Sequence, residues 1–196
     1  MQRRTFLQKS ATVLTLPGLM LAGCTANRNA GNEKAAGAAD QRRSIDADID
    51  GTIQRLYSTV SGSRELVAKS RGVLVFPSVI QAGFVVGVEH GKGALRVGGN
   101  SVGYYSTTSG SLGLQAGAQS KALIFLFLTQ DALDRFRESD GWSAGADASV
   151  ALVRMGANGL VDTTTAVKPV QAIVLTNAGL MADASLQGTK VSRLNE

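Results

Sequence analysis

The only cysteine of this 196-residue chain, Cys24, directly follows an apolar segment, and a lone thiol raises the question of redox chemistry. Arg3, Arg4 and Lys9 form a basic start, and residues 11–23 carry no charge. Small residues stand directly before the cysteine, which is the layout of an export signal. The uncharged run is shorter than the about 20 residues that a helix needs to cross a bilayer. The pattern therefore predicts a cleaved signal rather than a permanent membrane span.

The tetrapeptide Leu21-Ala22-Gly23-Cys24 resembles the bacterial lipobox, in which the cysteine receives a diacylglyceryl group and becomes the new N-terminus. On this resemblance, residues 1–23 are a lipoprotein signal peptide and Cys24 is the lipid attachment site, usually acylated again. Two or more acyl chains hold a protein stably at a membrane. Thr25 stands where an acidic residue would favour the inner membrane, so the expected location is the cell envelope, anchored in the outer membrane and facing the periplasm. Residues 3–9 also resemble a twin-arginine motif, which leaves the export route open.

A second candidate for chemistry is Ser101, because residues 99–103 match the nucleophile-elbow string G-x-S-x-G. A hydrolase of that kind needs a helix after the serine and a later histidine, whereas the sole histidine, His90, precedes Ser101. The glycines of residues 87–93 lack the spacing of a phosphate-binding loop and favour a β-turn. One histidine and one acylated cysteine leave no metal-ligand set. We therefore expect no catalytic residue, no metal and no cofactor, and the chain is predicted not to be an enzyme.

Charge also narrows the possible partners. The chain has 20 basic and 15 acidic residues, but the predicted signal contains three of the basic ones and none of the acidic ones. The mature chain is thus close to neutral, and we expect no nucleic-acid partner. Residues 24–43 contain no large apolar residue and predict an acylated N-terminus followed by a flexible tether, with a helix as the alternative for this Ala-rich stretch. Residues 44–196 then form a single domain.

The elements of that domain follow from periodicity. Ser44 is a candidate N-cap, and a stripe of apolar residues at steps of three and four predicts a helix, followed by a shorter helix that ends at residue 69 or 70. The stripe comprises Ile45, Ile49, Ile53, Leu56 and Val60. The stretch Ala122 to Leu128 is apolar on both faces and predicts a central strand, after which Thr129 caps a helix that ends near Ser139.

Other strands are expected at 72–76, ending at Pro77, and at 83–99 as two strands joined by a turn at 90–93. Further strands are expected at 112–119, 170–175 and 180–187, and residues 147–155 are ambiguous between helix and strand. Trp142 is expected as a partly buried anchor. Helices that precede mostly strands favour an α+β fold. The N-terminal helices would pack on a curved, largely antiparallel, glycine-rich β-sheet, with a barrel-like closure as the alternative.

Three sequence blocks carry a family resemblance. Gly-Val-x-Val-Phe-Pro at 72–77, Ala-Gly-Phe-x-x-Gly at 82–87 and Gly113-x-x-x-Gly117 resemble the SYLF family, also called the Ysc84 type, and the resemblance covers residues 45 to 195. It implies a lipid-binding domain, because eukaryotic relatives bind phosphoinositides and membranes and some bind actin. Bacterial members are often lipoproteins. The aromatic residues typical of the end of the domain are missing here.

These observations predict a non-enzymatic envelope lipoprotein whose tethered domain binds anionic membrane lipid headgroups. Headgroup contact would come from basic residues at element ends or turns, each worth about 1 kcal/mol near an anionic surface. The candidates are Lys69, Arg71, Lys92, Arg96 and Lys121. The alternative is a structural or interaction protein that docks an envelope protein partner through its sheet, with membrane attachment by acylation only. A hydrolase that uses Ser101 is a third hypothesis.

Overall fold

The fold combines three helices with one large sheet in the part of the chain that the structure describes. The computed structural model describes residues 29–83, 86–112, 119–154, 168–181, 186 and 188–194. Cys24 and the predicted signal lie outside these ranges. The elements in chain order are α1 (Asn29–Thr59), α2 (Ser63–Lys69), β1 (Gly72–Gly83), β2 (Val86–Val97), β3 (Asn100–Leu112), β4 (Gln119–Phe127), α3 (Gln130–Glu138), β5 (Gly141–Ser143), β6 (Val150–Leu152), β7 (Val170–Thr176), β8 (Gly179–Leu180) and β9 (Lys190–Arg193).

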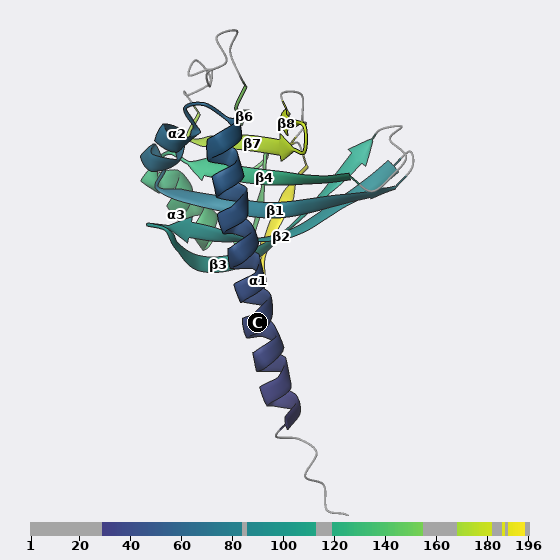
Figure 1. The fold of residues 1–196 in the computed structure, drawn as a ribbon. Helices are drawn as coiled ribbons and strands as arrows, with labels where there is room; N and C mark the ends of the chain where they lie inside the picture. Colours follow the sequence, from purple (N-terminus) through teal and green to yellow (C-terminus); the bar gives the residue numbers. More distant parts are fainter. Residues whose placement is uncertain are drawn as a thin grey trace, which may run out of the picture.

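The strands form a curled sheet that resembles half of a barrel (Figure 1). Its order is β5-β9-β3-β2-β1-β4-β7-β6, and β8 pairs with β7. The pair β6–β7 is parallel, and the other strand pairs of the described residues are antiparallel. The predicted α+β class and curved, largely antiparallel sheet are confirmed. The prediction of a central strand is also confirmed, because β4 lies between β1 and β7 and its residues 122–127 are all buried.

One face of the sheet is covered by α1, which crosses the strands, and by α2 (Figure 1). Ile45, Ile49, Leu56 and Val60 of the predicted stripe are buried in a core with alternate residues of β1, β4 and β7. Ile53, from the same stripe, is only partly buried. The spacing thus predicted correctly which face of α1 meets the sheet.

The opposite face of the sheet packs against α3. The side chain of Thr129 accepts a hydrogen bond from the backbone N–H of Ala132, so the predicted N-cap is confirmed. The buried face of α3 supplies Leu133 and Phe136 to this second core. Trp142 meets Phe125 edge to face at 5.2 Å between ring centroids, so it is an anchor as predicted, but at 3% exposed it is buried rather than partly buried.

The start of α1 corrects the prediction for residues 24–43. The helix begins at Asn29, so most of the expected tether is helical and Ser44 lies inside the helix rather than at its N-cap. Alanine-rich sequence has high helix propensity, and contacts with the sheet support this part of α1. The Lys92 ammonium donates to Gln41 Oε1 at 3.2 Å, and the Arg42 guanidinium lies 5.6 Å from the centre of the Tyr104 ring. Among the described residues no helix is long and apolar enough to cross a membrane.

The course of β1 and β2 also differs from the prediction. β1 does not end at Pro77 but continues to Gly83, and Pro77 falls at an irregularity where it has no register partner in β2 or β4. This placement suits a residue that has no backbone N–H. β2 is one continuous strand and has no turn at residues 90–93. A Cβ atom at Gly93 would overlap the carbonyl oxygen of Val75, so this glycine permits the close approach of β1 rather than a turn.

The turn that follows β2 lies instead at Gly98 and Gly99, whose φ angles are +58° and +86°. The ambiguous stretch 147–155 contains the strand β6. The strand predicted at 170–175 is confirmed as β7. Most of the stretches 112–119 and 180–187, expected as strands, lies outside the described residues.

Candidate functional site

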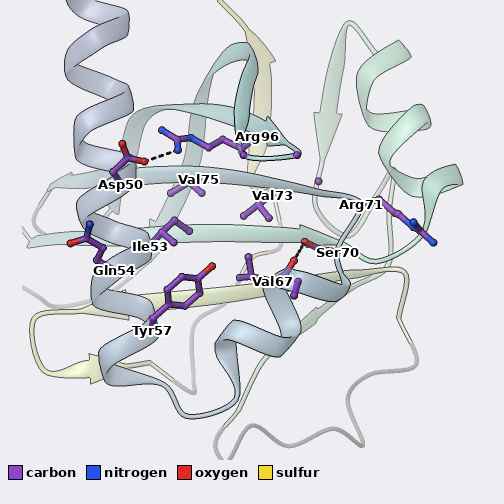
Figure 2. A pocket seen from close by; sticks show the side chains of 14 residues that line it. Asp50, Ile53, Gln54, Tyr57, Val67, Ser70, Arg71, Val73, Val75 and Arg96 are labelled. Carbon is purple, nitrogen blue, oxygen red and sulfur yellow. Dashed lines mark hydrogen bonds and ion pairs between the residues drawn. The ribbon is translucent and has the colours of Figure 1, made fainter.

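A cleft of about 540 Å³ lies where α1 and α2 meet β1 and the turn between β2 and β3 (Figure 2). This volume is within the range of about 300–1,000 Å³ that is usual for small-molecule sites. The lining residues come from segments that are far apart in the sequence: Asp50, Ile53, Gln54, Tyr57, Val67, Ala68, Ser70, Arg71, Gly72, Val73, Val75, Arg96, Gly98 and Gly99.

The wall of the cleft is apolar. Ile53 and Tyr57 lie one turn apart on α1, and Figure 2 shows them facing the strand that carries Val73 and Val75. Val67 of α2 completes this surface. α2 ends at Lys69, and at its C-cap the Ser70 hydroxyl donates to the Val67 carbonyl at 2.6 Å. The buried neighbours of Ile53 on α1 hold the helix on the sheet, which leaves Ile53 at the edge, where it can line a cleft.

The polar end of the cleft is built around Arg96. Its Nη1 donates to Asp50 Oδ1 at 2.6 Å, and its Nη2 donates to the backbone carbonyl of Asp46 at 3.1 Å. Its Nε is buried and has no hydrogen-bond partner among the described residues. The guanidinium is therefore held against α1 and offers only part of its donor capacity to a ligand.

Asp46 extends this network away from the cleft. Its two carboxylate oxygens accept hydrogen bonds from the Ser101 hydroxyl at 2.6 Å and from the Tyr104 hydroxyl at 2.8 Å. Burial, and then the hydrogen bond and the negative charge of Asp46, raise the pKa of Tyr104 above its usual value. Asp46, Asp50, Arg96, Ser101 and Tyr104, which we call the Asp46 network, fix α1 to β2 and β3.

Cationic residues of α2 and of the segment after it stand beside the lining residues of the cleft. Arg64 stacks over the Tyr57 ring at 4.4 Å. Lys69 and Arg71 are exposed, and within the described part of the chain neither side chain has a hydrogen bond or an ion pair. Figure 2 shows Arg71 pointing away from the apolar wall, toward the outside of the cleft. We call Arg64, Lys69 and Arg71 the cationic rim.

The five basic residues predicted from the sequence do not gather at one place. Arg71 and Arg96 line the cleft, and Lys69 ends the helix that borders it. Lys92 lies within β2 and donates to Gln41 of α1, while Lys121 lies within β4, on the face that carries α3.

Lys121 already has a partner of opposite charge. Its ammonium donates to Glu89 Oε1 at 2.8 Å, and the Ser109 hydroxyl donates to the other carboxylate oxygen at 2.9 Å. Glu89 is 8% exposed, so the charge of Lys121 is neutralised by a buried carboxylate on the face of the sheet that carries α3.

Sequence reasoning missed the apolar wall and the acidic partners of Arg96. Asp46 and Asp50 stand four residues apart and therefore share one face of α1, which is a signal that could have indicated a basic partner across the helix–sheet contact. The identity of that partner depends on strand register, which the sequence did not reveal.

The geometry gives little support to a serine hydrolase site at Ser101 or to a metal site among the described residues. Ser101 lies in β3, which continues to Leu112, rather than before a helix. His90 pairs in register with Thr108, seven positions along β3 from Ser101, so about 20 Å separates the two residues. In the described residues, no group of three or more His, Cys, Asp or Glu side chains could hold a metal ion.

Comparison with protein families places this chain beside a known family. The sequence model of the Ysc84 family, described as Las17-binding protein actin regulator, matches residues 108–196. The matched segment begins within β3 and includes β4, α3 and the later strands. The cleft-lining residues, at 50 to 99, precede it. No curated protein matches the chain.

Proposed function

Residues 108–196 of the chain match the Ysc84 family, and on this premise we propose that the protein is a non-enzymatic envelope lipoprotein whose domain binds anionic lipid headgroups. The observation that carries the proposal is the cationic rim beside an apolar cleft. Lys69 and Arg71 are exposed and have no acidic partner among the described residues, so their charges are available to an anionic surface.

The family description names Las17 binding and actin regulation. Actin is not expected in a bacterial envelope, so we do not extend that activity to this chain. Attachment to the membrane would come from acylation of Cys24 after removal of residues 1–23, with the domain facing the periplasm from the outer membrane. These parts of the proposal rest on the lipobox resemblance.

The absence of catalysis is also part of the proposal. The separation of Ser101 from the only histidine supports it, because a serine nucleophile of the hydrolase type needs a general base within hydrogen-bond reach. A hydrolytic activity that persisted in Ser101→Ala would exclude Ser101 as its nucleophile. Any hydrolytic activity intrinsic to the purified chain, whether or not Ser101→Ala abolished it, would overturn the non-enzymatic proposal.

Vesicle flotation tests headgroup binding without the acyl anchor. The non-acylated mature chain, residues 24–196 with Cys24→Ser, is expected to float with phosphatidylglycerol vesicles and to remain behind with phosphatidylcholine vesicles. Binding should weaken with added salt, because exposed charges are screened over about 10 Å at 0.1 M ionic strength. Equal flotation with both vesicle types, or none at low salt, would contradict the proposal.

The alternative function is docking of an envelope protein through the sheet. Ile80 and Val88, on neighbouring strands and on the face that carries α1, are 52% and 56% exposed. Crosslinking in cells would favour this alternative if one envelope protein were captured by the wild-type chain and lost with Ile80→Ser and Val88→Ser, while vesicle flotation stayed unchanged.

A further inference from the structure

We propose that the cleft between α1, α2 and β1 takes up the acyl chain of a single anionic amphiphile, such as a one-chain phospholipid, with the headgroup at the cationic rim. This inference deepens the proposed function and rests on it. Headgroup binding alone requires only exposed charge on the surface. The structure adds an apolar space directly behind that charge.

The first argument is the match between the cleft and one acyl chain. Ile53, Tyr57 and Val67 of the apolar wall are partly exposed, whereas Val73 and Val75 of the same wall are buried. With about 30 Å³ for a water-sized group, the cleft has room for roughly 18 such groups. That is comparable with the size of one acyl chain and smaller than the two chains of an ordinary phospholipid.

The second argument is charge complementarity. The charged residues that line the cleft are Arg71, Arg96 and Asp50, so its lining is cationic overall. Asp50 is engaged by Arg96 at the inner end, whereas Arg71 is exposed at the outer end and Lys69 is close to it in the sequence. An anionic headgroup therefore meets unpaired cations at the rim and no unpaired carboxylate inside.

The third argument is position. The cleft is formed by the C-terminal part of α1, whereas the N-terminal part of the helix extends past the edge of the sheet (Figure 1). From Asn29 to Tyr57 the helix axis measures about 42 Å, at about 1.5 Å per residue. Cys24 precedes Asn29 by five residues in the sequence, so an anchor there joins the chain at the end of α1 opposite the cleft. The cleft is therefore suited to a ligand that arrives as a single molecule.

Binding of monomeric amphiphiles tests this inference. The non-acylated mature chain with Cys24→Ser is titrated calorimetrically, below the critical micelle concentration, with lysophosphatidylglycerol, lysophosphatidylcholine or chain-free glycerophosphoglycerol. We expect one saturable site for lysophosphatidylglycerol, binding at least about tenfold weaker for the zwitterionic lipid, and no detectable binding of the chain-free headgroup. Equal binding of the chain-free headgroup would overturn the inference.

Filling the cleft provides the matched variants. Ala68 is exposed on α2 and lines the cleft, so Ala68→Trp should reduce lysophosphatidylglycerol affinity at least about tenfold. Ala39→Trp, at an exposed α1 position that does not line the cleft, should leave the affinity unchanged. If Ala68→Trp does not fold, as judged by circular dichroism, Gln54→Trp at another exposed lining position replaces it.

The results separate the two proposals. Normal flotation of Ala68→Trp with anionic vesicles, together with its loss of monomer binding, would support both. Normal monomer binding by a folded Ala68→Trp and Gln54→Trp would overturn uptake into the cleft, even if vesicle flotation held. Failure of the wild-type chain to float with anionic vesicles would instead overturn the proposed function.

Discussion

Arg96 shows how a residue expected to meet solvent can be engaged within the fold. The sequence places it close to the glycines that end β2, which is a suitable position for headgroup contact. In the structure its guanidinium is hydrogen-bonded to Asp50 and to the Asp46 backbone, so most of its capacity serves the contact between α1 and the sheet. Arg71, two residues beyond α2, has no such partner among the described residues and is the better candidate for ligand contact.

Gly93 tests the close approach of β1 and β2. Gly93→Ala should lower the free energy of unfolding by more than about 2 kcal/mol, because the new methyl group would overlap the Val75 carbonyl and contact the Phe76 ring. The midpoint of urea unfolding measures this loss. Gly110→Ala, in β3, is the control, since nothing lies within 4 Å of its added Cβ atom. Similar midpoints for the two variants would show that the strands are not packed as described.

The tyrosine pair at 104 and 105 predicts a dependence of stability on alkaline pH. Burial raises the pKa of both hydroxyls above the usual value of 10.0, and the hydrogen bond to Asp46 raises that of Tyr104 further. The folded state therefore retains both protons to a higher pH than the unfolded chain. The stabilisation is fully present below pH 10 and is lost as the pH rises above it.

Urea unfolding at a series of pH values measures this effect. The decline in stability of the wild-type chain above pH 10 should be steeper than that of Tyr104→Phe or Tyr105→Phe, and steeper still than that of the double variant. Parallel declines in all four proteins would contradict the assignment of the effect to these residues.

Among the elements, α1 shows what periodicity can and cannot reveal. Steps of three and four identified the apolar stripe correctly, because the side chains of one helix face recur with that spacing whatever they pack on. The predicted N-terminus of the helix was wrong by 16 residues, because α1 begins at Asn29 rather than at Ile45, after Ser44. Contacts of Gln41 and Arg42 with the sheet support the part of α1 that precedes Ser44. Such contacts depend on the tertiary structure and cannot be predicted from the spacing of residues in one sequence.

For the strands, too, the sequence predicted some features correctly and others wrongly. Apolar residues on both faces identified β4 as central, since a strand buried on both sides needs no polar alternation. The glycines at 91 and 93 were interpreted as a turn, whereas they lie inside β2 opposite the irregularity of β1. A glycine that turns the chain and a glycine that admits a neighbouring backbone look alike in a sequence.

The contact of α1 with the sheet gives a prediction at the element scale. Ile49 is fully buried beneath the helix, so Ile49→Ala should lower the free energy of unfolding by about 2–5 kcal/mol. Ile80→Ala deletes the same atoms at a site that is 52% exposed, and its cost should be below about 1 kcal/mol. Thermal or urea unfolding measures both. Equal costs would contradict the packing of α1 on this face.

At the scale of the whole molecule, the cleft could not be predicted from the sequence. Its lining combines residues of α1, α2, β1 and the turn after β2, and only the packing of the two helices on the sheet brings them together. The sequence did indicate the basic residues, of which Arg71 and Arg96 line the cleft while Lys92 and Lys121 lie elsewhere. The same packing places the cationic rim beside the apolar wall, far along α1 from Asn29.

The central claim, that the cationic rim binds anionic lipid, is tested most directly by comparing two variants of equal charge change. The apparent affinity of the non-acylated mature chain for phosphatidylglycerol vesicles is measured at low salt for Lys69→Gln with Arg71→Gln, and for Arg43→Gln with Arg135→Gln. The second pair removes exposed arginines that are bonded to Asp40 and Asp131 on their own helices.

We expect the rim variant to bind about 10- to 30-fold more weakly than the wild-type chain, since each exposed cation contributes about 1 kcal/mol. The control variant should lose less than about threefold. A rim variant that binds as tightly as the control would contradict the account.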